Sequence, residues 1–108
     1  MYSDGMSLED LQQKIMNKLT MAPPLGAKIK FDCGEEGVIL LDGTGAAPMI
    51  STENVKDEAA DTTMHCTADI LRGIAEGSTD PTMAYMTGSL RIEGSLGYAL
   101  KLAGILGD

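Results

Sequence analysis

Apolar residues recur at helical spacing in the first part of the chain. Four of them, separated by three or four positions, would share one face of a helix: Leu8, Leu11, Ile15 and Leu19. Ser7, followed three residues later by Asp10, resembles a capping box at the start of such a helix. Pro23 and Pro24 cannot continue it. The pattern therefore predicts an amphipathic helix that begins after Ser7 and ends near residues 19–21.

The pattern then changes to a period of two, which is typical of β-strands. It predicts four strands, at residues 28–33, 38–41, 49–52 and 62–67. The first alternates polar and apolar side chains, whereas the second is apolar on both faces. Turn residues at 34–37 join these two strands into a hairpin, and the polar residues 53–61 form a longer connection.

Helical and strand signals alternate in the last third of the chain. Residues 68–76 predict a helix that ends at Gly77. Asp80 before Pro81 predicts the start of a short helix that stops at Gly88. The remaining residues predict a fifth strand at 89–93 and a last helix at 96–106.

The predicted last helix is apolar nearly all round, with Lys101 as its only charged residue. One broad apolar sector holds most of its side chains: Leu96, Ala99, Leu100, Leu102, Ala103 and Leu106. Tyr98 and Ile105 lie on the opposite side, beside Lys101. Because a sheet covers only one side of a helix, we expect another helix, a second subunit or a ligand to cover the rest.

The order of short motifs from residue 60 to residue 106 resembles the sterol carrier protein family. That family has, in order, an Ala-Asp pair, a glycine that ends a helix, an Asn-Pro or Asp-Pro turn, a strand introduced by glycine, and a helix with a Gly-Leu-Ala-Met-Lys-Leu pattern. The corresponding residues here are Ala60-Asp61, Gly77, Asp80-Pro81, residues 88–94 and residues 97–102. Ser89 stands where the family often has a basic residue.

The resemblance implies an α+β fold. Its five-stranded, mostly antiparallel sheet would be covered by helices, with an apolar tunnel between sheet and helices. Members of the family bind sterols, fatty acids, fatty acyl-CoAs or other lipids there and perform no chemistry on them. Many relatives continue beyond the last helix, whereas this sequence stops at Gly107-Asp108. We therefore expect a more open tunnel, or one that a second subunit closes.

Eight residues are the candidate lining of this tunnel: Met64, Met83, Met86, Leu90, Ile92, Leu96, Leu100 and Ala103. The chain holds eight methionines, and flexible thioethers adapt well to irregular ligands. The alternative is that methionine fills gaps in a core with one Phe and no Trp. An empty apolar cavity would be costly, so we expect the tunnel to be collapsed, hydrated or occupied by a lipid.

Charge excludes several classes of partner. The net charge of −8 opposes binding to nucleic acid and to anionic lipid headgroups, which both need clustered Lys and Arg. We expect a neutral or weakly charged ligand rather than an acyl-CoA, and at most transient membrane contact. With 108 residues the chain is expected to form one domain, residues 1–108. We see no signal peptide in the sequence and expect a cytoplasmic protein.

The sequence gives little indication of a catalytic or a metal site. His65 and Cys66 are neighbours on a predicted strand and so point to opposite faces. Cys33 and Cys66 are expected to be buried thiols rather than a bridge. The acidic pairs, Asp61 with Asp69 and Glu35 with Glu36, are interpreted as solvated carboxylates. We therefore predict no catalytic residue, no metal and no cofactor. The predicted function is non-catalytic lipid binding, and the alternative is a homodimeric interaction module with a collapsed cavity.

Overall fold

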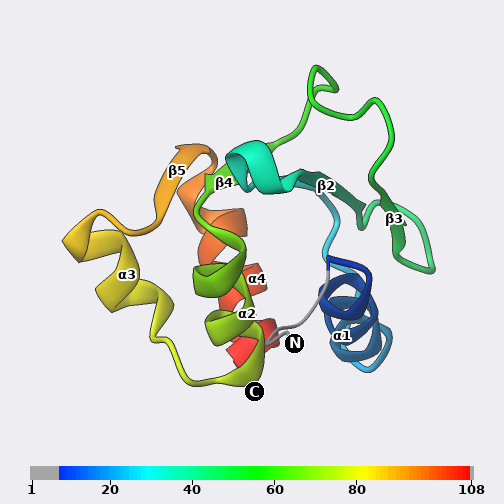
Figure 1. The fold of residues 1–108 in the computed structure, drawn as a ribbon. Coiled ribbons are helices and arrows are strands. Elements are labelled where there is room, and N and C mark those ends of the chain that lie inside the picture. The colour runs from blue at the N-terminus through cyan, green and yellow to red at the C-terminus, as the bar shows by residue number, and fades with distance from the viewer. Residues whose placement is uncertain (1–7, 108) are drawn as a thin grey trace.

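The computed structural model describes residues 8–107 and contains four α-helices and five strands (Figure 1). Their order along the chain is α1 (Leu8–Thr20), β1 (Lys28–Asp32), a 3-10 turn (Gly34–Glu36), β2 (Val38–Asp42), β3 (Met49–Ser51), β4 (Thr62–His65), α2 (Ala68–Glu76), α3 (Pro81–Thr87), β5 (Arg91–Gly94) and α4 (Leu96–Gly107). Each predicted helix and strand is present. The capping role predicted for Ser7 lies outside the described residues.

The five strands form one sheet in the order β3-β2-β1-β4-β5. The β1–β2, β2–β3 and β4–β5 pairs are antiparallel, whereas β1 and β4 run parallel in the middle of the sheet. The expectation of an α+β fold with a mostly antiparallel sheet is therefore confirmed. Because β1 and β4 are parallel neighbours, their C-terminal ends lie side by side.

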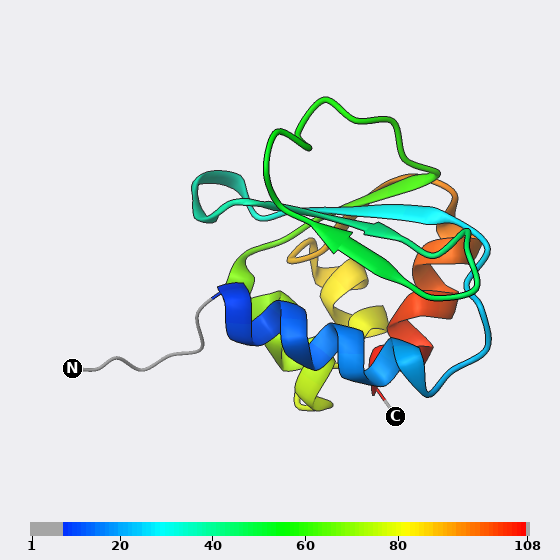
Figure 2. The same ribbon diagram turned by 90° about the vertical axis from the view of Figure 1, so that its right-hand side faces the viewer.

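The four helices cover one face of the sheet, and the long connection before β4 arches over the other (Figure 2). The core lies between sheet and helices and includes fully buried residues of both layers: Ile15, Phe31, Met64, Leu71 and Leu102. Leu40 lies between the inward-facing Ile39 and Leu41 and so points to the opposite face of the sheet. It is nevertheless buried, as is Val55 of the long connection. The connection thus explains why β2 is apolar on both faces.

Helix α1 follows the predicted pattern because Leu11, Ile15 and Leu19 are buried on one face. Helices α2 and α3 also have the predicted ends. Asp80 caps α3 by accepting a hydrogen bond from the Thr82 N–H, and Gly77 ends α2 in the left-handed conformation.

Each strand differs from its predicted bounds by at least one residue, and two of them, β4 and β5, differ by two residues at one end. β4 ends at His65 rather than at residue 67, because the Thr67 side chain accepts a hydrogen bond from the Ile70 N–H as the N-cap of α2. β5 begins at Arg91 rather than at residue 89, because the Leu90 N–H donates to the Ala84 carbonyl of α3. At both positions a hydrogen bond to a neighbouring helix is formed where the prediction placed part of a strand.

Among the residues that the structure describes, none of the helices has both the length and the apolar character needed to cross a bilayer.

Candidate functional site

The eight candidate lining residues fall into two groups. Met64, Leu90 and Ala103 are buried, and Ile92 is partly buried against the core. The other four are exposed side chains of the last two helices: Met83, Met86, Leu96 and Leu100. The structure therefore brings the first group together in the core and leaves the second on the surface.

The buried group is organised by the β4–β5 pair. Met64 lies opposite Ile92 in the antiparallel register, so both side chains are on the same face of the sheet. Met64 belongs to the core, which identifies this face as the one that the helices cover. Helix α4 packs against β4 and β5. These residues could line a cavity only if α4 moved away from the sheet.

Helix α3 packs loosely on the rest of the molecule. Ala84 is its only buried residue, whereas Met83 and Met86 are exposed by 55% and 73% of their surface. No charged residue occurs between Asp80 and Arg91. In Figure 1 this helix lies beside β5, away from α1. A projecting, uncharged helix with exposed thioethers is an unusual surface in a chain of net charge −8.

Helix α4 is apolar on both its covered and its open side. Ala99, Leu102, Ala103 and Leu106 are buried. Leu96 and Leu100, one turn apart, are exposed by 42% and 46% of their surface. Ile105, which the helical pattern placed beside Lys101 and away from the main apolar sector, instead packs against the core. The reason is that α4 contacts both α1 and α2 as well as the sheet, so that its covered sector is displaced.

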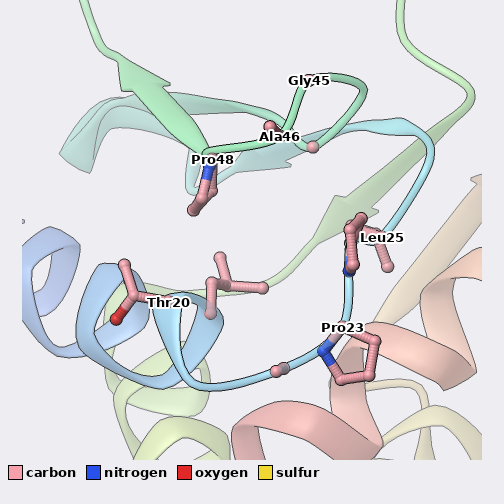
Figure 3. Close-up of a pocket in the computed structure, with 10 residues that line it drawn as sticks. Thr20, Pro23, Leu25, Gly45, Ala46 and Pro48 are labelled. Carbon is pink, nitrogen blue, oxygen red and sulfur yellow. The ribbon is translucent and has the colours of Figure 1, made fainter.

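Two hollows adjoin the connection between α1 and β1. The first is enclosed by the end of α1, this connection and the turn between β2 and β3, and it measures about 50 Å³ (Figure 3). Pro23, Leu25 and Pro48 are among its lining residues. A space of this size holds little more than ordered water, whereas small-molecule sites measure roughly 300–1,000 Å³.

The second hollow is larger, about 330 Å³, and lies between the ends of α1 and α4. Lys18, Met21, Ala22, Pro23 and Ile105 line it. None of the eight candidate residues contributes to either hollow. The sequence does not predict this hollow, because the Met-Ala-Pro-Pro run after α1 has no periodic pattern and resembles that of an ordinary loop.

The polar groups mostly have structural partners. The His65 imidazole contacts the Glu93 carboxylate through Nε2 and lies 3.7 Å from Asp32 Oδ2 through Nδ1. Cys66 packs instead against the core on the inner face. His65 and Cys66 therefore face opposite sides, as predicted. Within residues 8–107 there is no group of three or more His, Cys, Asp or Glu side chains that could hold a metal ion.

Three of the four paired acidic residues have specific partners rather than solvent alone. Asp61 Oδ2 accepts from the Lys28 N–H at 2.8 Å, which anchors the start of β1. Glu36 Oε1 accepts from the Ala68 N–H at 2.9 Å and so caps α2. Asp69 pairs with Arg72 one turn later. Each of these three carboxylates therefore supports local structure.

Comparison with known proteins identifies both family and fold. The sequence profile of the SCP-2 sterol transfer family matches residues 8–107. A comparison with curated protein sequences found no significant match. Among solved structures, sterol carrier protein 2 of Yarrowia lipolytica in its apo form has a TM-score of 0.72 at 22% identity, over 97% of this chain and 93% of that one.

Two further structures show how widely this fold is used. Palmitated SCP2L2 of Aedes aegypti has a TM-score of 0.71 at 17% identity, over 95% of this chain and 96% of that one. The sec-alkylsulfatase Pisa1 of a Pseudomonas species has a TM-score of 0.65 at 16% identity. In that case the match covers 89% of this chain but 14% of the enzyme, so the same fold also occurs as a part of a larger enzyme.

Proposed function

The chain belongs to the SCP-2 sterol transfer family, whose domains generally bind lipids, and from this premise we propose that it binds and carries one apolar lipid without altering it chemically. The proposed unit is the single domain of residues 1–108, acting in the cytoplasm. The proposed site comprises exposed side chains of α3 and α4, which would meet the ligand: Met83, Met86, Leu96 and Leu100.

The observation that carries this proposal is the exposure of those four large apolar side chains on two helices beside β5. Burial of one such side chain is worth roughly 1.5–3 kcal/mol when complete. An acyl chain that covers parts of all four side chains would therefore bind favourably, because it removes their apolar surface from water. The uncharged stretch between Asp80 and Arg91 favours a neutral or weakly charged ligand over one that carries phosphates.

The loose packing of α3 supports a route for the ligand towards the sheet. Ala84 is the only buried residue of this helix, so moving it outward uncovers little core. The buried candidates Met64, Leu90, Ile92 and Ala103 would become the inner wall of the site only if α4, which packs against β4 and β5, also moved. The palmitated Aedes relative favours a single acyl chain as the ligand class.

A binding titration with a fluorescent fatty acid tests the site. We expect Met86→Glu and Leu100→Glu each to weaken binding at least about tenfold, because a carboxylate beside an acyl chain loses hydration. Both residues are exposed, so the fold should tolerate the change. Met49→Glu is the matched control, since Met49 is 65% exposed on β3 and distant in the sheet.

A fourth variant separates the proposed site from the hollow at the end of α1. Met21, which is 89% exposed, lines that hollow. If Met21→Glu weakened binding while Met86→Glu and Leu100→Glu did not, lipid would bind at the α1 end and the assignment to α3 and α4 would be wrong.

The exposed side chains of α4 also favour one alternative, a homodimer that buries Leu96 and Leu100 between two copies. In this interaction module the cavity would stay collapsed. Light scattering distinguishes the two functions, because the alternative requires a dimer in lipid-free protein and its loss in Leu100→Glu.

A further inference from the structure

Cys33 and Cys66 lie side by side at the ends of the two parallel strands. Each follows its strand directly, and the last residues of the strands, Asp32 and His65, are paired in register. The Cys66 N–H donates to the Asp32 carbonyl at 3.3 Å, which extends the pairing by one residue. Neighbouring strands are about 4.8 Å apart, within the Cα separation of roughly 4.4–6.8 Å that a disulfide needs.

The two side chains share the inner face of the sheet. Phe31 and Met64, two residues earlier on each strand, are fully buried. Both cysteines are free thiols. Cys33 is 5% exposed, whereas Cys66 is only partly buried. The strand pairing and the common orientation of the two side chains are therefore compatible with a disulfide.

The contact makes the two thiols unequal. The hydrogen bond from Cys66 lowers the pKa of Cys33, although burial and the nearby Glu36 and Asp32 carboxylates oppose this change. The same hydrogen bond, together with burial, raises the pKa of Cys66. Since the thiolate is the reactive form, the lowered pKa favours Cys33 as the first sulfur to react with an oxidant.

We propose that Cys33 and Cys66 are a modification site, in which a peroxide forms a disulfide and a dithiol reductant breaks it. The Cys33 thiolate attacks one oxygen of hydrogen peroxide, the O–O bond breaks, and the released hydroxide takes a proton to give water. The resulting sulfenic acid is attacked by the Cys66 sulfur, which forms the S–S bond and releases the second water. Two thiols are thus oxidised while one peroxide is reduced to two waters.

The disulfide would join the residues just after β1 to the start of α2, two segments that a hydrogen bond already connects. Cys66 precedes Thr67, the N-cap of α2, and Cys33 precedes the 3-10 turn that carries Glu36. Glu36 accepts a hydrogen bond from the Ala68 N–H at the start of α2. A bond between the cysteines would therefore fix the first turn of α2 to the end of β1. This effect does not depend on the proposed lipid site.

Intact-mass and thiol-labelling measurements test the site on the whole chain. The reduced protein should carry two thiols that react with iodoacetamide once it is denatured. After one equivalent of hydrogen peroxide per chain, we expect no reactive thiol, a mass loss of two hydrogen atoms, and one peptide that links Cys33 to Cys66. Dithiothreitol should restore both thiols. The oxidised form should melt about 5–15 °C higher, because the crosslink closes a long loop.

Single-cysteine variants test the order of the two steps. Cys66→Ser should stop at a Cys33 sulfenic acid, which dimedone traps, and Cys33→Ser should form no disulfide within the chain. The melting temperature of each reduced variant verifies that it is folded. Disulfide-linked dimers, sulfinic acid on each cysteine, or two unchanged thiols in the wild-type chain would each overturn the proposal.

Discussion

The Lys18 ammonium group near the end of α1 donates a hydrogen bond of 2.5 Å to the Leu106 carbonyl in the last turn of α4. The same Nζ donates to the Ala75 carbonyl in the last turn of α2 at 2.6 Å. The last carbonyls of a helix lack partners within the helix and carry partial negative charge. One cation therefore ties together the ends of three helices.

We expect Lys18→Met to destabilise the protein by about 2 kcal/mol, because it removes two charge-assisted hydrogen bonds at helix ends. Urea denaturation measures this free energy of unfolding. Lys14→Met is the matched control on the same helix, since Lys14 forms a surface ion pair with Glu76 at 3.7 Å. Such pairs are worth roughly 0–1 kcal/mol. Equal effects of the two substitutions would show that the link between helices contributes no more than a surface ion pair.

Gly94 allows β5 to pass close to the start of β4. Its φ is +89°, and a Cβ there would lie 2.5 Å from the Asp61 carbonyl oxygen. We expect Gly94→Ala to cost at least about 2 kcal/mol in the free energy of unfolding. Gly88→Ala is the control, because Gly88 has a φ of +87° but open space around it. The control should cost about 1 kcal/mol, and a similar cost at both positions would mean that the close approach is unimportant.

Asp80 caps α3, and we expect its replacement to affect this helix more than the stability of the whole domain. Its side chain accepts from the Thr82 N–H at 3.0 Å, and the helix has only seven residues. We expect Asp80→Ala to weaken this helix by about 1 kcal/mol. Hydrogen exchange of the α3 amides should speed up about fivefold, while the melting temperature changes little. A large fall in melting temperature with unchanged α3 exchange would contradict the loose packing of this helix.

The lowered pKa of the Asp42 carboxyl is expected to make the folded state less stable at acidic pH. Hydrogen bonds from Thr44, through its hydroxyl and its backbone N–H, lower the pKa of the Asp42 carboxyl. A lowered pKa stabilises the folded state above the ordinary carboxyl pKa, and this contribution is lost as pH falls through the lowered value. We expect Thr44→Ala to raise the Asp42 pKa towards normal in an NMR titration. An unchanged pKa would show that the hydroxyl is not the cause.

The sequence predicted the elements well because their ends depend on local chemistry. Gly77, Asp80 and Pro81 act within one turn of where they stand, and the buried face of α1 follows from spacing alone. The sequence pattern alone did not predict which strands run parallel, since the β1–β4 pair depends on contacts more than 30 residues apart, such as Phe31 with Met64. The mostly antiparallel sheet came from the family resemblance.

The candidate site was predictable only in part. Periodicity identified apolar side chains on α4, but it could not tell the buried Ala103 from the exposed Leu100, because that depends on where α1 and α2 pack. The neighbouring positions of Cys33 and Cys66 likewise follow from the β1–β4 register and not from any motif.

Native mass spectrometry tests the central claim of lipid binding most directly. Purified chain, stripped of lipid and then incubated with a mixture of palmitate, cholesterol and phosphatidylcholine, should retain one lipid per chain. Leu100→Glu should retain much less, and Met49→Glu should match the wild type. A bare mass for the wild-type chain under every loading condition, whether monomer or dimer, would contradict lipid binding.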